Sequence, residues 1–366
     1  MLNFMFAALF QMLPVIAGVS ITAPTKKSTF LLFLFTLGTI ALLLAFNFTT
    51  LTWLYPLALL SLGFSIFISI LPILVKLVTT STHTASSKGM MLALSSLGFV
   101  VLCAFYLLLT LNGNIEGTHY SHVKTAHYSF GLFGWIALLI LSISFQVIEM
   151  FYVTPSYPKY VSHDFPMVLF VLLLSTAILG FVFLDIWRSS QLLMYVLLGY
   201  YAVFTLKRLT QRKRPLTDAT MWFWRLGLSS LLVSLATSAL AEFNTLALLK
   251  PLSYIFFASF TLSIVFAMFY KIIPFLTWFH LNSQGYFTAP MMHEVIHPKT
   301  AKKHLYIHLA TIVTFVLSIF IHLLIFVAGA LTILSFSWMA WQIVHAWKLY
   351  NHTQKTGEKF YMGSIV

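Results

Sequence analysis

Long apolar runs follow one another along the whole chain, and most of the charged residues lie in the short segments between them. A run of roughly 20 apolar residues is what a helix needs to cross the ~30 Å hydrocarbon layer of a membrane. Only 8% of the 366 residues are charged, whereas an average soluble domain carries about 25%. So few charges cannot cover a water-facing surface, but lipid tolerates an apolar exterior. The sequence therefore predicts an all-α, polytopic integral membrane helical bundle and not a soluble enzyme.

The apolar runs predict about eleven or twelve spanning helices, which form a single transmembrane domain over residues 1–366. The last two share the nearly uninterrupted stretch 305–348, which would measure ~66 Å as one helix at ~1.5 Å per residue. We therefore expect the chain to fold back there, with Gly329 at the turn. The eleven expected ranges are 3–23, 29–48, 53–75, 90–111, 127–151, 166–187, 189–206, 221–241, 251–278, 305–327 and 331–349.

The basic residues predict how the chain is oriented. With the N-terminus outside and eleven crossings, the 21 Lys and Arg residues all fall on the inner side except Lys124, Arg188 and Lys250. Cytoplasmic loops of membrane proteins carry such an excess of positive charge. We therefore expect a multi-pass protein of the bacterial inner (cytoplasmic) membrane with a cytoplasmic C-terminus. The same rule explains the net charge of +13, so we expect no nucleic acid partner.

Histidine is the residue type that most suggests chemistry. The chain has 13 His against 8 Asp and Glu together, and imidazole is the usual protein ligand for haem iron and a common one for copper and zinc. The single cysteine, Cys103, lies inside an apolar run. One cysteine excludes a Cys-x-x-Cys-His haem attachment and an all-cysteine iron–sulfur site, so any haem would be held without a covalent bond.

Three histidines lie near the outer end of the fifth expected helix. His127 opens that helix, and Gly131 and Gly134 follow on the same face. Glycines there would allow the close approach of a flat macrocycle or of another helix. We take His127 as a candidate haem ligand, with a polar cap at the membrane interface as the alternative. His119 and His122 are candidate metal ligands, with solvated loop residues as the simpler interpretation.

The tenth expected helix carries a second set of histidines. His308 and His322 are fourteen residues apart, which is nearly four turns and puts both imidazoles on one face. His322 lies at a depth comparable with His127, so a haem between these two residues is geometrically reasonable. His308 is a further candidate metal ligand, although hydrogen bonding between helices is the simpler interpretation for it and for His304.

Two further features involve acidic residues. Glu149, at the inner end of the fifth helix, is a candidate for proton or cation uptake, with a cap at the interface beside Lys159 as the alternative. The stretch His293–His297 matches the His-Glu-x-x-His pattern of zinc proteases, which needs both histidines on one helical face. Pro298 follows at once and limits any helix, so we interpret this match as a coincidence in a histidine-rich loop.

Two stretches resemble a group of bacterial membrane proteins. They run from His127 to Pro158 (HYSFGLFGWIALLILSISFQVIEMFYVTPSYP) and from Tyr270 to His297 (YKIIPFLTWFHLNSQGYFTAPMMHEVIH). That group looks related to subunit I of haem–copper oxidases and nitric oxide reductases and to NnrS-type haem–copper proteins. The resemblance implies a helical bundle in which histidines from different helices hold haem. The chain departs from the oxidases because it lacks their His-Pro-Glu-Val-Tyr element and any His-His pair.

The leading hypothesis is a membrane protein that binds haem b, with copper as a further candidate, through His127 and His322. Its role would lie in respiration, nitric oxide response or metal homeostasis. We expect the lipid bilayer as its main partner and other respiratory membrane subunits as candidate protein partners. The alternative is a transporter or permease without redox chemistry, which would use Lys271 near a helix break at Pro274, together with Glu149.

Overall fold

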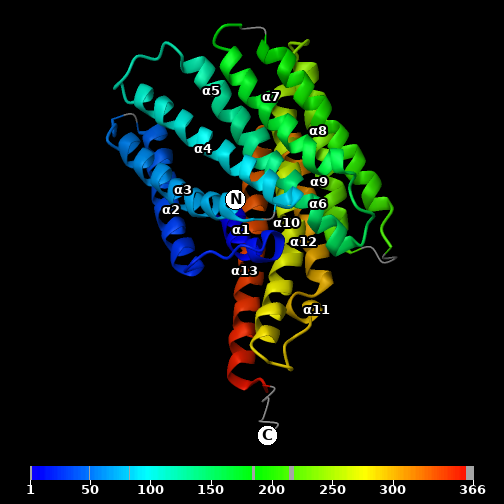
Figure 1. Cartoon of the computed structure of the whole chain (residues 1–366). Coiled ribbons are helices and arrows are strands. Elements are labelled where there is room, and N and C mark those ends of the chain that lie inside the picture. The colour runs from blue at the N-terminus through cyan, green and yellow to red at the C-terminus, as the bar shows by residue number, and fades with distance from the viewer. Residues whose placement is uncertain (1, 49, 82, 184–185, 214–217, 360–366) are drawn as a thin grey trace. The chain divides into compact units, whose positions relative to one another are not determined.

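The computed structural model describes residues 2–48, 50–81, 83–183, 186–213 and 218–359 (Figure 1). Within these residues the regular secondary structure is helical, apart from one isolated bridge between Tyr286 and Lys359. The expected all-α membrane bundle is therefore confirmed. Arg214, which the orientation argument counts among the inner basic residues, lies outside the described residues. The chain divides into two compact units, unit 1 (Met1–Leu197) and unit 2 (Leu198–Val366).

Unit 1 is built around α4, which packs against α1, α3, α5, α6 and α7. Met90, Ala93 and Leu94 of α4 are completely buried. Thr84 caps this helix, because its side chain accepts a hydrogen bond from the backbone N–H of Ser87. The elements of unit 1 are α1 (Leu2–Ala17), α2 (Pro24–Asn47), α3 (Leu54–Thr79), α4 (Ala85–Leu111), α5 (Tyr120–Ser129), the π-helix η1 (Phe130–Ala137), α6 (Leu138–Tyr152), the π-helix η2 (Tyr160–Asp164), α7 (Phe165–Leu179) and the first half of α8 (Ile186–Thr210).

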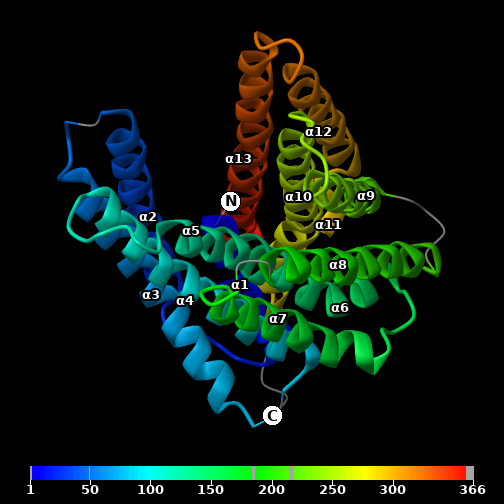
Figure 2. The same cartoon turned by 90° about the horizontal axis from the view of Figure 1, so that it is seen from above.

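Unit 2 is built around α10, which packs against α9, α12 and α13 (Figure 2). The approach of α9 to α10 depends on Gly227, where an added Cβ would lie 2.9 Å from the side chain of Ile264 and 3.1 Å from the carbonyl oxygen of Phe260. A small residue is typical of such close helix contacts in membranes. The elements of unit 2 are the second half of α8, α9 (Ala219–Ala241), α10 (Leu249–Ser283), α11 (Met292–Val295), α12 (Pro298–Ser318) and α13 (Leu324–Thr356).

Large apolar side chains on the outside of these helices confirm that the surface suits lipid. Phe33 of α2, Val196 of α8 and Phe326 of α13 are 66%, 67% and 75% exposed. In the described part of the chain, nine helical segments are long and apolar enough to cross a membrane. The segment α1 is apolar but has only 16 residues, and the first turns of α12 carry three lysines, Lys299, Lys302 and Lys303.

Each of the eleven predicted spans overlaps a helix of the described residues, but 3–23 and 166–187 run past the ends of α1 and α7, and the last two spans are divided elsewhere than expected. The chain turns at residues 319–323, between α12 and α13, and Gly329 lies inside α13. This prediction was wrong because the turn contains no glycine or proline, and His322 is the only one of its residues that is not apolar. Ile321 donates its backbone N–H to Leu317, and Leu324 donates to Ile321.

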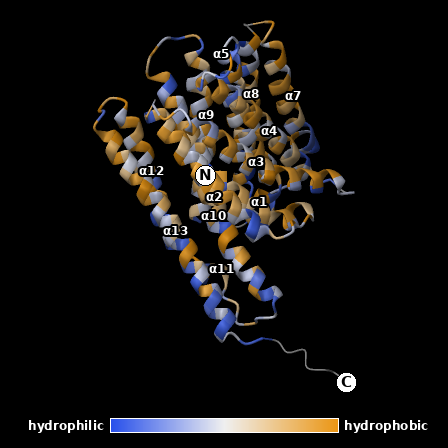
Figure 3. Ribbon diagram, turned by 90° about the vertical axis from the view of Figure 1, so that its left-hand side faces the viewer, coloured by the Kyte–Doolittle hydropathy of each residue, from blue (hydrophilic) through white to orange (hydrophobic). Residues whose placement is uncertain are grey.

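Two helices of unit 2 are longer than a membrane crossing requires. With 35 and 33 residues, α10 and α13 measure roughly 50 Å each and exceed the ~30 Å hydrocarbon layer. Figure 3 shows hydrophilic residues gathered where these two helices extend beside α11. The ends are joined there by hydrogen bonds from Gln284 to Tyr350 and from Tyr286 to the carbonyl oxygen of Gln354.

Candidate functional site

His127 lies on α5, seven residues after the helix begins at Tyr120. The sequence predicted that His127 would open the helix, and this was wrong because the chain already turns at Gly117. The backbone N–H of Tyr120 donates to the Gly117 carbonyl, and that of Val123 donates to the His119 carbonyl. His127 therefore stands within a helix, which limits the orientations that its side chain can adopt.

One ring nitrogen of His127 is fixed by the neighbouring helix. Its Nδ1 lies 3.0 Å from the carbonyl oxygen of Val100 on α4. A carbonyl oxygen only accepts hydrogen bonds, so Nδ1 carries the proton and the lone pair lies on Nε2. In the described part of the chain, Nε2 has no hydrogen-bond partner. Metal-bound histidines typically show this arrangement, with the second ring N–H donated to a carbonyl or carboxylate.

The two glycines after His127 face α4, as the spacing predicted, but they differ in their surroundings. A Cβ on Gly134 would lie 2.7 Å from the side chain of Ser96, so this glycine is needed for helix packing. A Cβ on Gly131 would meet only the side chain of Val100, at 3.9 Å. A small side chain would therefore fit at Gly131, four residues after His127. At Gly134 the side chain of Ser96 on α4 already occupies that space.

The helix that carries His127 is distorted immediately after it. Residues 130–137 form the π-helix η1 between α5 and α6, and such π-helical turns occur frequently at functional sites. Two polar atoms of this stretch, Ser129 Oγ and Trp135 Nε1, are buried without a hydrogen-bond partner in the described residues. Buried polar atoms normally have a partner in the protein, water or a bound group.

His119, the N-cap residue of α5, and His122, in its first turn, both contact the ring of Phe181. The ring of His122 stacks on Phe181 with centroids 5.4 Å apart, and His119 meets the same ring edge-on at 5.5 Å. His122 Nε2 lies 2.5 Å from the carbonyl oxygen of Gly180. Both histidines thus hold the segment after α7, and their role as metal ligands stays a prediction.

His322 lies in the turn between α12 and α13 and is exposed, and not inside the tenth helix as expected. The shared face that was predicted for His308 and His322 is therefore absent, because α12 ends at Ser318. His127 belongs to unit 1 and His322 to unit 2, so a haem held by this pair stays a prediction.

Glu149 lies in the last turn of α6. Its carboxylate oxygen Oε1 accepts the backbone N–H of Tyr157 at 2.8 Å, and its carbonyl oxygen accepts the backbone N–H of Val153. Val153 has a φ of 54°, the left-handed conformation that often ends a helix. This supports the interpretation of Glu149 as a cap, and its role in proton uptake stays a prediction.

His304 and His308 are buried between the helices of unit 2, with exposed fractions of 0% and 2%. His304 Nδ1 lies 2.9 Å from Tyr270 Oη on α10, and His304 Nε2 lies 2.6 Å from Ser335 Oγ on α13. His308 Nε2 lies 2.9 Å from Ser263 Oγ on α10. The predicted hydrogen bonding between helices is therefore confirmed, and a metal role for His308 stays a prediction.

Tyr270, Ser263 and Ser335 were not among the predicted site residues. Nothing in the sequence marks these three residues, because serine and tyrosine are common in membrane helices and only the packing of the helices decides which of them contacts a histidine. Phe266 also packs against both histidines. The centroid of its ring lies 4.5 Å from that of His304 and 5.0 Å from that of His308.

The His-Glu-x-x-His match adopts another structure than a protease needs. The helix α11 ends at Val295, and Ile296 is extended, so His293 and His297 do not share one helical face. Glu294 accepts the backbone N–H of Met291, and His297 Nδ1 accepts that of Lys299. These residues cap α11 and α12, as expected for a coincidental match. In the described residues, no group of three or more His, Cys, Asp or Glu side chains is placed to hold a metal ion.

Lys271 forms an ion pair with Asp218, the N-cap residue of α9, with 2.5 Å between Nζ and Oδ2. Burial raises the pKa of Asp218, but the charge of Lys271 and hydrogen bonds from Lys271, Thr220 and Met221 lower it more, so the pKa lies below its ordinary value. The expected break at Pro274 is absent, because α10 continues from Leu249 to Ser283.

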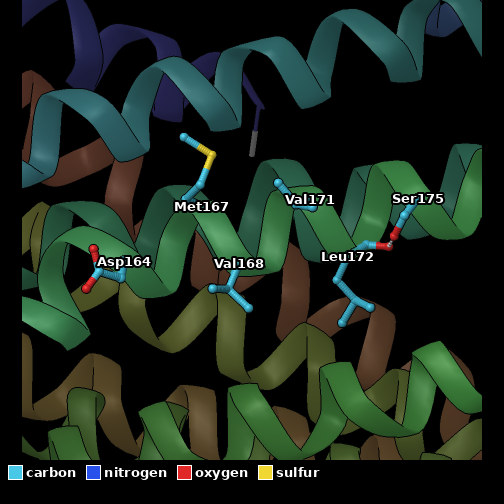
Figure 4. Close-up of a pocket in the computed structure, with 6 residues that line it drawn as sticks. All are labelled: Asp164, Met167, Val168, Val171, Leu172 and Ser175. Carbon is cyan, nitrogen blue, oxygen red and sulfur yellow. Dashed lines mark hydrogen bonds between the residues drawn. The ribbon is translucent and has the colours of Figure 1, made fainter.

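A groove of about 440 Å³ runs along α7 in unit 1. Figure 4 shows its six lining residues, which are apolar except for one at each end: Asp164, Met167, Val168, Val171, Leu172 and Ser175. None of the predicted site residues lines it, so this groove does not complete the site at His127.

Comparison of the chain with protein-family models, with curated proteins and with solved structures gives no match.

Proposed function

We propose that this integral membrane protein binds haem b through His127, in the inner membrane of a bacterium. The observation that carries the proposal is the hydrogen bond from His127 Nδ1 to the Val100 carbonyl oxygen. With the proton on Nδ1, the lone pair of Nε2 can bind a metal. A haem held this way would supply electron transfer or the binding of a small diatomic molecule. Respiration, nitric oxide response and metal homeostasis are the roles that fit, with copper as an alternative cofactor.

The surroundings of His127 support a bound group. Gly131 leaves space beside the imidazole, and Ser129 Oγ and Trp135 Nε1 are buried polar atoms that a bound group or water would satisfy. The resemblance of residues 127–158 to haem–copper membrane proteins supports the same ligand.

The optical spectrum of the detergent-purified, haem-supplemented protein tests the proposal. We expect a Soret band and a b-type difference spectrum between the reduced and oxidised states in the wild type. The His127→Ala variant should lose them. The matched control is His163→Ala, because His163 is an exposed histidine of the same unit. Folded wild-type protein without a Soret band would overturn the proposal.

The second candidate function is a transporter or permease without redox chemistry. The observation that favours it is the ion pair between Lys271, which lies within α10, and Asp218, the N-cap residue of α9, because ionisable groups at membrane depth mark ion and substrate pathways. A transporter should be colourless after haem supplementation, and respiratory subunits should not copurify with it. These two outcomes separate it from a haem protein that assembles with respiratory partners.

A further inference from the structure

The outward face of α12 changes from charged to apolar along its length. Positions 299, 303, 306, 310, 313 and 317 follow one another at intervals of three and four residues, so they form one stripe of the helix. The other side of α12 carries buried residues such as Ala301, Leu305 and Ile312. We name the stripe the α12 stripe, and its members, all exposed, are Lys299, Lys303, Tyr306, Ala310, Val313 and Leu317.

Three positive charges gather at the start of the α12 stripe. Lys299 and Lys303 belong to it, Lys302 flanks it, and all three are exposed. Like charges three or four residues apart destabilise a helix, but α12 has no acidic residue to balance them. The carboxylate of Glu294 accepts the backbone N–H of Met291 instead. In the described part of the chain, none of the three ammonium groups forms an ion pair or a hydrogen bond. The cluster is therefore open to an external anion.

Two aromatic side chains place the lysines at the membrane–water interface. Tyr306, which follows them in the stripe, is 58% exposed, and Trp341 of α13 is 73% exposed. The helices α12 and α13 are antiparallel neighbours, joined by one short turn and by the contact between His304 and Ser335. Lys299, five residues before His304, is therefore level with the residue just before Trp341. Exposed tryptophan and tyrosine are typical of the level of the lipid headgroups.

The apolar part of the α12 stripe has the length of one lipid leaflet. From Tyr306 to Leu317 the helix rises ~17 Å, which is about half of the ~30 Å hydrocarbon layer. Val313 and Leu317 are 55% and 46% exposed on this length. A free phosphate would use the lysines alone, whereas a phospholipid joins an anionic headgroup to acyl chains of this length. The stripe therefore matches one phospholipid molecule better than a soluble anion.

We propose that α12 binds an anionic phospholipid of the phosphatidylglycerol type. Lys299, Lys302 and Lys303 contact the headgroup phosphate, and the acyl chains lie along the apolar part of the stripe. The Tyr306 hydroxyl has no hydrogen-bond partner in the described residues and is available to the phosphate or ester oxygens. Phosphatidylcholine fits less well, because its headgroup carries a positive charge that the lysines repel. This inference uses unit 2 alone and does not depend on haem at His127.

Native mass spectrometry of the full-length protein in detergent tests the proposal. The protein is mixed with phosphatidylglycerol or with phosphatidylcholine of the same acyl chains, and the fraction that holds one lipid is followed against lipid concentration. We expect the wild type to bind phosphatidylglycerol more tightly. Lys299→Gln/Lys303→Gln should weaken that binding about 25-fold, since each lysine beside anionic lipid contributes roughly a five-fold factor. Lys299→Arg/Lys303→Arg keeps both charges and should keep the affinity.

The matched control is Lys355→Gln/Lys359→Gln. It also removes two exposed lysines from unit 2, but Lys355 lies fourteen residues after Trp341, ~21 Å further along α13. This variant should keep the wild-type affinity for phosphatidylglycerol. Glycerophosphoglycerol, the same headgroup without acyl chains, should not displace the bound lipid. Gel filtration and thermal unfolding establish that the variants are folded.

Four results would overturn the proposal. The first is a wild type that binds both lipids equally, and the second is a folded Lys299→Gln/Lys303→Gln that binds phosphatidylglycerol as tightly as the control. The third is displacement of the lipid by glycerophosphoglycerol, which would assign the lysines to a soluble anion. The fourth is a dimer of the chain in place of the lipid adduct. Because the haem proposal is read from an optical spectrum and this one from the mass of a bound lipid, the failure of either leaves the other standing.

Discussion

His127 in unit 1 and His304 in unit 2 both lie in apolar helices, but their rings differ in how many nitrogens are hydrogen-bonded. His127 is half-buried, and one of its nitrogens is fixed by the Val100 carbonyl oxygen. His304 is completely buried, and hydroxyl groups of Tyr270 and Ser335 hold both of its nitrogens. A histidine with one nitrogen left for a ligand suits a cofactor, whereas one with both nitrogens bonded suits packing or proton transfer. Depth in the membrane does not distinguish these two kinds of histidine, but the hydrogen bonds do.

The strongest test of this difference between the two histidines is to remove each imidazole and record the haem spectrum. His127→Ala should abolish the Soret band, because the proposed axial ligand is gone. Folded His304→Ala should keep it, because neither ring nitrogen of His304 is open to a metal in the wild type. A Soret band that survives in His127→Ala and vanishes in His304→Ala would reverse the assignment of the two histidines.

The same two variants should also differ in the free energy of unfolding. His304→Ala should lower it more than His127→Ala. His304→Ala leaves the hydroxyl groups of Tyr270 and Ser335 buried without their partner and opens a cavity beside Phe266. We expect a loss of about 3 kcal/mol in the free energy of unfolding. His127→Ala removes one hydrogen bond from a half-buried ring and should cost about 1 kcal/mol. Thermal unfolding in detergent, without added haem, measures both, and equal losses would contradict the comparison.

Two glycine substitutions sharpen the description of the His127 region. Gly134→Ala should destabilise the protein by about 1–3 kcal/mol, because the added methyl group would meet the side chain of Ser96 at 2.7 Å. Gly131→Ala should stay within about 0.5 kcal/mol of the wild type, since its nearest neighbour would lie at 3.9 Å. Thermal unfolding of the two variants side by side checks this. A larger loss in Gly131→Ala would show that the space beside His127 is filled.

The smallest expected effect concerns the ion pair between Lys271 and Asp218. Asparagine at position 218 keeps a side-chain oxygen for the N-cap of α9 but loses the charge that faces Lys271. The carboxyl group is 38% exposed, and solvent screens the pair, so Asp218→Asn should cost less than about 1 kcal/mol at neutral pH.

The pH dependence of that loss follows from the lowered pKa of Asp218. The stabilisation is present above the ordinary value of 3.8 and disappears as the pH falls through the lower pKa of the folded protein. Unfolding curves of wild type and Asp218→Asn should therefore differ at neutral pH and converge in acid. A difference that grows in acid would contradict the sign of this shift.

Part of the candidate site could be predicted from the sequence. His127 and the direction of Gly131 and Gly134 follow from helical spacing, which survives the π-helix η1 because all three residues still face α4. The position of His322 could not be predicted, since a turn that contains no glycine or proline, and is apolar apart from His322 itself, leaves no signal in the sequence. The partners of His304 could not be predicted either, because Tyr270 and Ser335 are distant in the chain.

The sequence by itself determined that this chain is a helical membrane protein, and each of the eleven predicted spans overlaps a helix of the described residues, where nine helical segments are long and apolar enough to cross a membrane. The physical reason is that a bilayer imposes the same length and the same apolar composition on every crossing, so each segment can be recognised alone. Only the tertiary structure decided which polar side chains meet, such as His304 with Ser335 or Lys271 with Asp218. Those contacts depend on which faces of the helices pack together. Lipid places few restraints on that choice, because an apolar helix face has nearly the same free energy against lipid as any other apolar face.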